Sequence, residues 1–203
     1  MTTENTSLLE LIQVRRSIRR YSSQPVPREW IDKMLKAAIW APSAHNRQPW
    51  RFVVIEQAET KEQLATSMGA RLQRDLSTDH VPQAIIDKDV SRSYDRITSA
   101  PIIIVVCVTV VDMDVYSDEK RNHYESVMAI QSSAMAGQNL LLMAQDLGLG
   151  ACWMCAPLFC PDVVQEALAL PEDWQAQGMI TLGFPAQTRE KTRKPLESSI
   201  LWR

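Results

Sequence analysis

The sequence lacks the features that would place the chain in a membrane or on a nucleic acid. Its longest strongly apolar run, residues 102–111, is far too short to cross a bilayer. Residues 1–7 are polar and contain no apolar core of a signal peptide. Lys and Arg number 22 against 24 Asp and Glu, so no excess of positive charge supports nucleic-acid binding. We therefore expect a cytoplasmic protein with neither membrane nor nucleic-acid partners.

Internal repeats, low-complexity linkers and a dinucleotide-binding loop are missing as well. Without a linker, the 203 residues are expected to form a single domain over residues 1–203. No Gly-x-Gly-x-x-Gly motif follows a predicted strand, which argues against a Rossmann domain for a nicotinamide. Because 45% of the residues are hydrophobic, one domain of this length can bury a sizeable core.

Cysteine is scarce, and the four present are expected to be free thiols, as is usual in the cytoplasm. Cys152 and Cys155 form a C-x-x-C pair and Cys160 adds a third thiol. No His lies nearby to complete the four ligands of a structural metal site, so no metal is predicted. No His–carboxylate pair or activated nucleophile stands out either, and no side chain is predicted to be catalytic in itself.

Helical and strand patterns alternate along the chain, with helix predominating, which indicates an α+β fold. Two capping-box patterns, Ser7 to Glu10 and Thr60 to Gln63, mark helix starts. Helices are predicted over residues 8–14, 27–41, 63–76, 83–96, 124–146 and 161–168, and strands over residues 52–55, 102–111 and 179–182.

The predicted helix 124–146 has apolar or small residues on almost every face, so it must be covered nearly all round. The single domain could bury this helix in its own core. Alternatively, the helix lies in a subunit interface, where the small side chains of residues 132–137 would let another backbone approach. Composition alone supports both explanations equally.

The densest charge cluster is residues 15–20, Arg-Arg-Ser-Ile-Arg-Arg. Arginine presents a planar fork of donors suited to phosphate oxygens, and Ser17 adds a hydroxyl. If the preceding helix continues this far, Arg15 and Arg19 lie one turn apart on one face. By itself, however, the cluster fits a solvated basic helix end better than a binding site.

A second cluster is the loop of residues 41–50, which two prolines hold between a helix and a strand. Ser43, Asn46 and Gln48 offer neutral hydrogen-bonding groups that could recognise the edge of a heterocycle. The alternative is a purely structural loop, in which Asn46 satisfies backbone groups and Trp50 packs in the core.

Taken together, these clusters resemble the nitroreductase family. The basic motif at residues 15–21 is followed by Pro-Ser-Ala-His-Asn-Arg-Gln-Pro-Trp at residues 42–50. Ser-Ala-Pro at residues 99–101, Gly-Leu-Gly-Ala-Cys-Trp at residues 148–153, Leu-Gly-Phe-Pro at residues 182–185 and Lys-Thr-Arg-Lys-Pro at residues 191–195 then occur in the expected order. The marks cover nearly the whole chain, and they are specific as a set rather than singly.

The resemblance implies a nitroreductase-like α+β fold, with a central mixed but mostly antiparallel sheet flanked by helices, in an intertwined homodimer. It also implies FMN at the subunit interface, with NADH or NADPH as a transient electron donor. By position in the motifs, Arg15 would bind the phosphate, and residues 42–46 would reach the FMN of the other subunit. The cofactor-binding residues so implied are Arg15, Arg16, Ser17, Arg19, Pro42, Ser43, Asn46, Gln48, Pro157, Leu158, Lys191 and Arg193.

Residues 152–161 and the ending Leu-Trp-Arg are similar to one branch of the family, the flavin reductase domain of deazaflavin-coenzyme biosynthesis. The function implied by the family is an oxidoreductase that passes two electrons from NAD(P)H to a small organic acceptor, such as a nitroaromatic or a quinone, by a ping-pong mechanism. Two alternatives are a dedicated reductase of a biosynthetic intermediate and a flavin or thiol redox sensor without turnover.

Overall fold

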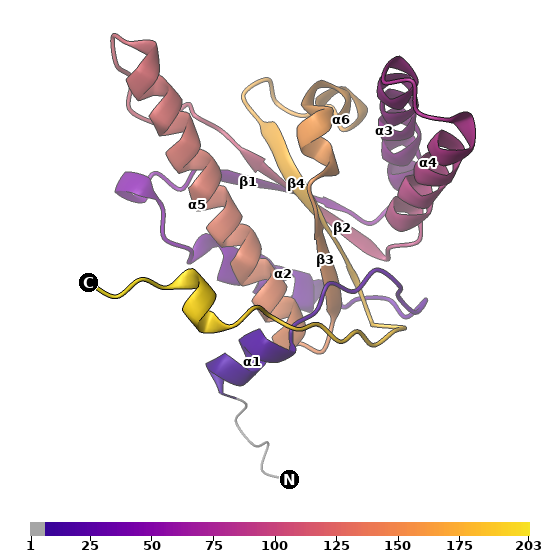
Figure 1. The fold of residues 1–203 in the computed structure, drawn as a ribbon, viewed down its shortest axis with the longest axis horizontal. Helices are drawn as coiled ribbons and strands as arrows, with labels where there is room; N and C mark the ends of the chain where they lie inside the picture. Colours follow the sequence, from indigo (N-terminus) through magenta and orange to yellow (C-terminus); the bar gives the residue numbers. More distant parts are fainter. Residues whose placement is uncertain (1–6) are drawn as a thin grey trace.

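The computed structural model describes residues 7–203, which form a central antiparallel sheet between two layers of helices (Figure 1). The strands follow one another across the sheet in the order β1, β2, β4, β3, and each neighbouring pair is antiparallel. Their bounds are β1 Trp50–Ile55, β2 Ile102–Val108, β3 Gly150–Met154 and β4 Gln175–Gly183. The expected α+β fold with a mostly antiparallel sheet is confirmed, and the one parallel contact within residues 7–203 is an isolated bridge between Ser17 and Ala151.

The helices form one layer on each face of the sheet. Their bounds are α1 Leu8–Val14, α2 Arg28–Ile39, α3 Ala58–Thr78, α4 Gln83–Thr98, α5 Glu119–Asp146 and α6 Pro161–Ala167. Alternate residues of β2 point to opposite faces, as in any strand. Ile104 packs in the cluster with α2 and α5, whereas Ile103 packs in the cluster with α3, α4 and α6. Every residue of β2 is buried, because both of its faces are covered.

Several predicted boundaries are confirmed, and others need correction. The capping box of Ser7 and Glu10 does begin α1, but Thr60 lies inside the first turn of α3, which begins at Ala58. Helix α5 begins at Glu119, five residues earlier than predicted, because the Asp118 side chain accepts a hydrogen bond from the backbone N–H of Arg121. Strand β2 ends at Val108 instead of residue 111, since the chain turns there.

Strand β3, which begins at Gly150, was not predicted from the sequence. Gly148 does end the helix in the left-handed conformation, with φ of 75°. Gly150, in contrast, begins the strand and lies directly against Ile18. A Cβ atom at Gly150 would come within 2.7 Å of Ile18 Cγ2, so glycine allows this close approach.

One chain covers only one side of α5. Ala136 and Leu140 are fully buried against the sheet, while Tyr124, Ile130 and Met135 remain exposed. Burial of the helix inside its own domain, one of the two explanations considered, is therefore wrong for this outer face. Although α5 has 28 residues, it is not apolar enough to cross a membrane, and neither is any other helix within residues 7–203.

Candidate functional site

The basic motif is an extended segment fixed against the edge of the sheet at β3. The backbone N–H of Ile18 donates to the carbonyl oxygen of Ala151 over 3.0 Å. Three residues later, the Tyr21 hydroxyl donates to carbonyl oxygens of Ile18 and Thr181, at 2.6 and 2.9 Å. These bonds join the motif to β3 and β4 and set where its arginines lie.

Because α1 ends at Val14, Arg15 and Arg19 do not lie one helical turn apart, as a continued helix would have required. Side chains of an extended segment alternate instead, so every second residue points the same way. Ile18 is buried against Gly150, while Arg15, Ser17 and Arg19 are partly exposed and line one cavity. The spacing Arg-x-Ser-x-Arg thus places three donors side by side on an extended backbone.

This cavity, which we call the basic pocket, also receives the C-terminal tail. Its volume is about 170 Å³, and its lining residues are Arg15, Arg16, Ser17, Arg19, Arg189, Lys191 and Arg193. In Figure 1 the tail passes close to α1, and residues 189–193 thereby lie beside the basic motif. Six of the twelve cofactor-binding residues expected from the resemblance therefore lie together in this pocket. No carboxylate lines it.

The electrostatics of the basic pocket suit an anion. Burial lowers the pKa of Arg15 because it disfavours the charged guanidinium, and repulsion from Arg193 and Arg16 lowers this pKa further. The Nε atom of Arg16 is buried without a hydrogen-bond partner among residues 7–203. A phosphate dianion would offset the repulsion and accept bonds from these forks and from the Ser17 hydroxyl.

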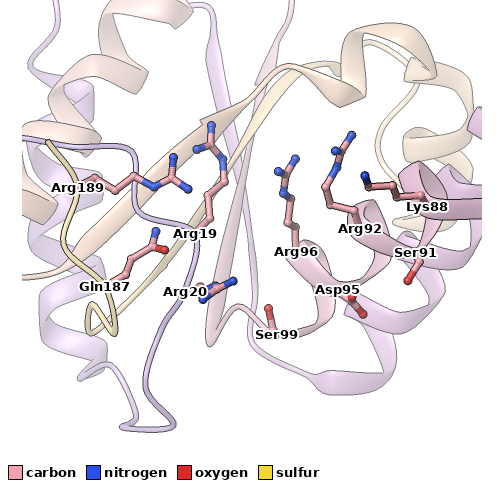
Figure 2. Close-up of a pocket in the computed structure, with 10 residues that line it drawn as sticks. All are labelled: Arg19, Arg20, Lys88, Ser91, Arg92, Asp95, Arg96, Ser99, Gln187 and Arg189. Atoms are coloured by element: carbon pink, nitrogen blue, oxygen red, sulfur yellow. The ribbon is translucent and has the colours of Figure 1, made fainter. Parts of the chain in front are cut away.

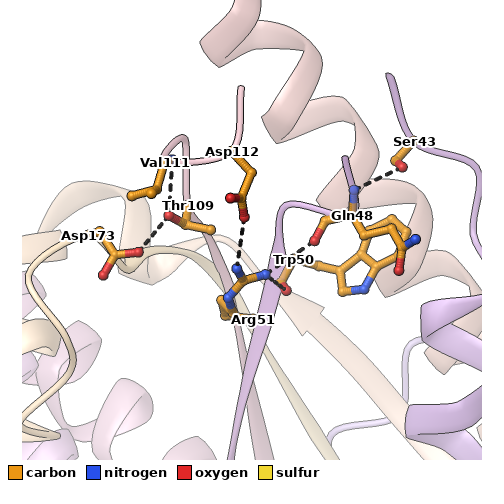
Figure 3. A network of polar contacts seen from close by, with 8 residues as sticks. All are labelled: Ser43, Gln48, Trp50, Arg51, Thr109, Val111, Asp112 and Asp173. Carbon is orange, nitrogen blue, oxygen red and sulfur yellow. Dashed lines mark hydrogen bonds and ion pairs between the residues drawn. The ribbon is translucent and has the colours of Figure 1, made fainter. Parts of the chain in front are cut away.

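The second cluster is a tightly bonded loop after α2 (Figure 3). The backbone N–H of Gln48 donates to Ser43 Oγ over 3.1 Å, and the Gln48 side chain donates to Asn46 Oδ1 over 3.3 Å. His45, Asn46 and Gln48 have φ between 50° and 54°, a left-handed conformation that is uncommon for residues other than glycine. Such strain is typical of loops that bind ligands, and here Pro42 leads into it.

The loop and the basic pocket do not meet within one chain. The backbone N–H of Ala44 donates to Ser132 Oγ of α5 over 3.3 Å, whereas the basic motif is bonded to Ala151, just beyond the C-terminal end of that helix. With a rise of 1.5 Å per residue, the twelve residues from Ser132 to Ala144 alone separate the two places by about 18 Å. Figure 1 shows the violet turn at residues 44–46 beside α5, away from α1 and the tail.

The remaining two expected residues lie in the 3-10 turn Ala156–Phe159, beyond the far end of β3. Pro157 is buried, and Leu158 is half exposed. Leu158 lines a separate cavity with residues that include Ile130 and Trp174. Neither residue reaches the basic pocket.

Sequence reasoning missed a second basic cavity next to the first, which we call the α4 cleft (Figure 2). Its volume is about 460 Å³, and it is lined by Arg19, Arg20, Lys88, Ser91, Arg92, Asp95, Arg96, Ser99, Gln187 and Arg189. Lys88, Arg92 and Arg96 are four residues apart, so they share one face of α4. This spacing was visible in the sequence, but the facing partners around Arg189 were not.

The four cysteines are free thiols, as predicted, and only Cys155 is exposed. Within residues 7–203 one group of potential metal ligands gathers, His45, Asp114 and Glu125, with ligand atoms within 4.8 Å of one another. Arg47 forms an ion pair with Asp114 and so already occupies one of these carboxylates. The expectation that no metal is bound stays a prediction.

Comparison with known proteins agrees with this architecture. A protein of Methanothermobacter thermautotrophicus that bears the name NADH dehydrogenase/NAD(P)H nitroreductase is 32% identical over 182 residues, which cover 89% of this chain and 78% of that protein. The structure of a Desulfovibrio desulfuricans nitroreductase in complex with FMN matches 99% of this chain and 98% of its own, with a TM-score of 0.75 and 31% identity.

A BluB-like flavoprotein of Clostridium difficile covers 97% of this chain and 99% of its own, with a TM-score of 0.79 and 26% identity. The sequence profile of the nitroreductase family matches residues 12–184, a range that runs from the helix before the basic motif to the end of β4. The extended basic motif, the helix-covered antiparallel sheet and these matches lead to one conclusion: the chain belongs to the nitroreductase family.

Proposed function

We propose that this chain is an FMN-dependent oxidoreductase that takes two electrons from NADH or NADPH and passes them to a small organic acceptor. The observation that carries the proposal is the basic pocket, in which arginines from both ends of the chain converge with the Ser17 hydroxyl and no carboxylate. The similar Desulfovibrio protein is in complex with FMN, and the similar Methanothermobacter protein has both NADH and NAD(P)H in its name. A single terminal phosphate suits this pocket, which favours FMN.

In this proposal the Arg15 fork and the Ser17 hydroxyl hold the FMN phosphate, with Lys191 and Arg193 closing over it from the tail. FMN supplies the redox chemistry, so the protein contributes binding, orientation and charge. Arg19 lines both the basic pocket and the α4 cleft, so its charge would lie beside the bound phosphate. There it would help to stabilise the negative charge of reduced FMN.

We further propose that the active form is a homodimer. Because Ser43 and Asn46 lie far from the basic pocket of their own chain, they can serve an FMN site only in a second copy. Exposed apolar side chains support this assembly: Trp202 is 87% exposed and Leu201 74%, and Ile130 of α5 is uncovered. A second copy that covered these apolar side chains would remove them from water.

The test is to purify the protein without added flavin and to identify the extracted cofactor by mass. We expect FMN, and anaerobic NADH or NADPH should bleach its visible absorbance before any acceptor is added. Recovery of FAD, or a protein that binds no added FMN, contradicts the proposal. Flavin that is reduced but never reoxidised by quinones or nitroaromatics would instead favour one of the two alternatives, a dedicated reductase of one intermediate or a redox sensor.

A further inference from the structure

The α4 cleft extends the basic surface beyond the residues assigned to FMN. We propose that this cleft is a second anion-binding site, which takes a phosphate or carboxylate group of the small molecule that exchanges electrons with the cofactor. The inference rests on the proposed function, because it names the chemistry of that function's substrate.

Charge is the first argument. Six cationic side chains line the cleft against the single carboxylate of Asp95, although the whole chain carries a net charge of −2. In Figure 2, the guanidinium groups of Arg92 and Arg96 on α4 lie across from those of Arg19 and Arg189, while Asp95 points away from them. The positive charge is therefore not neutralised within the cleft.

The three cationic residues on one face of α4 show the same excess of positive charge. Lys88, Arg92 and Arg96 are like charges one helical turn apart, an arrangement that destabilises a helix unless something compensates for it. Asp89 accepts a bond from Arg92 over 2.6 Å, which engages only one of the five N–H groups of that guanidinium. Arg96 has no carboxylate partner among residues 7–203. Burial, followed by repulsion from Arg19 and Arg92, lowers the pKa of Arg96.

An unsatisfied donor is the second, independent argument. The Nε2 atom of Gln187, in the lining of the cleft, is buried without a hydrogen-bond partner among the described residues. Burying an amide N–H without an acceptor is unfavourable, and an anionic oxygen would satisfy it. No aliphatic or aromatic residue lines the cleft, and its many cationic groups favour an anionic ligand over a neutral one.

The α4 cleft can be tested apart from the phosphate site. The two cavities share only Arg19 and Arg189. Lys88 and Arg92 belong to the cleft alone, so they can be replaced while every residue assigned to the FMN phosphate is kept.

The experiment compares ligand pairs that differ in an anionic group, with no reductant present so that nothing turns over. Calorimetry on the FMN-loaded protein would measure NADP⁺ against NAD⁺, and 4-nitrobenzoate against 4-nitrobenzyl alcohol. The test variant is the double replacement Lys88→Gln and Arg92→Gln. The matched control is Lys33→Gln with Arg74→Gln, which removes the same two charges from exposed positions outside both cavities.

We expect the anionic member of at least one pair to bind about tenfold more tightly than its neutral counterpart, since a bond to a charged group is worth roughly that factor. The test variant should reduce this preference to about twofold and leave the neutral member unchanged, whereas the control keeps it. If the test variant loses the preference in the nicotinamide pair, the cleft binds the phosphate of the electron donor. If it loses the preference in the nitro pair, the cleft binds an acidic acceptor.

The proposal is overturned if neither pair shows a preference in the unmodified protein, or if the preference survives in the test variant. Failure of the proposed function looks different. A protein that binds no FMN, or whose flavin is not reduced by NAD(P)H, contradicts the proposed function, while the preference for an anion could still be measured by calorimetry on the protein as purified.

Discussion

Replacement of Arg15 by Ala tests the phosphate assignment most directly. Arg15 is partly buried and faces Arg193 across a pocket without carboxylates. A hydrogen bond to a charged group contributes about 1.5–3 kcal/mol, so its loss should weaken FMN binding roughly ten- to hundredfold. Arg193 is exposed on the tail, where water screens its charge, so Arg193→Ala should weaken FMN binding by about tenfold.

The same geometry predicts that Arg15→Ala affects the stability of the FMN-loaded protein but not that of the free protein. Without FMN, Arg15→Ala removes repulsion from Arg16 and Arg193, so the free energy of unfolding should change little. With FMN bound, the variant should lose stability in proportion to its lost affinity.

Titration of apoprotein with FMN, followed by flavin fluorescence, measures the affinity, and urea unfolding measures stability in both states. Arg28→Ala is the control, because Arg28 is exposed and pairs with the surface carboxylates of Asp32, at 3.3 Å, and Glu56. If Arg15→Ala and Arg193→Ala both keep the affinity of the unmodified protein within about twofold, the pocket does not hold the phosphate.

Four further predictions follow from the structure and the proposed function. Light scattering at micromolar concentration should give about twice the chain mass of 23.0 kDa, and an active, flavin-loaded monomer would refute the shared site. Initial rates against donor at several acceptor concentrations should give parallel lines, as expected for ping-pong turnover, whereas intersecting lines would require a ternary complex. At pH 8 an aromatic disulfide reagent should modify one thiol, Cys155, in the native apoprotein and four thiols in urea. Burial raises the pKa of Cys107 to about 12 and also raises the pKa values of Cys152 and Cys160, so these three thiols should react only after unfolding. The fast reaction should be lost in the variant Cys155→Ser. Gly137→Ala should lower the free energy of unfolding by about 1–3 kcal/mol, since its Cβ would overlap the Trp153 ring, and unchanged urea unfolding would show that the ring can move aside.

Sequence patterns predicted those helices and strands that are specified by residues close together in the chain. The capping box of Ser7 and Glu10 gave the start of α1, and the β-branched run gave β2, because both depend on neighbours in the chain. Strand β3 escaped prediction because Gly-Ala-Cys-Trp-Met has no β-branched residue and two small ones. It is a strand because β4 pairs with it and because Ile18 needs Gly150 beneath it.

The sequence by itself determined the family and the residue types of the candidate site, because the order of the motifs and their hydrogen-bond donors do not depend on the path of the folded chain. Only the tertiary structure decided which of these residues meet. Burial of both faces of the sheet joins Tyr21 to Thr181, 160 residues away, and returns the tail with Arg193 to Arg15. The same packing turns the cationic face of α4 toward Arg19 and leaves Ser43 far from the basic pocket. Contacts of such separation depend on how the layers pack rather than on local propensity, so local patterns alone do not reveal them; only the resemblance of the motifs to a family had grouped Arg15 with Arg193.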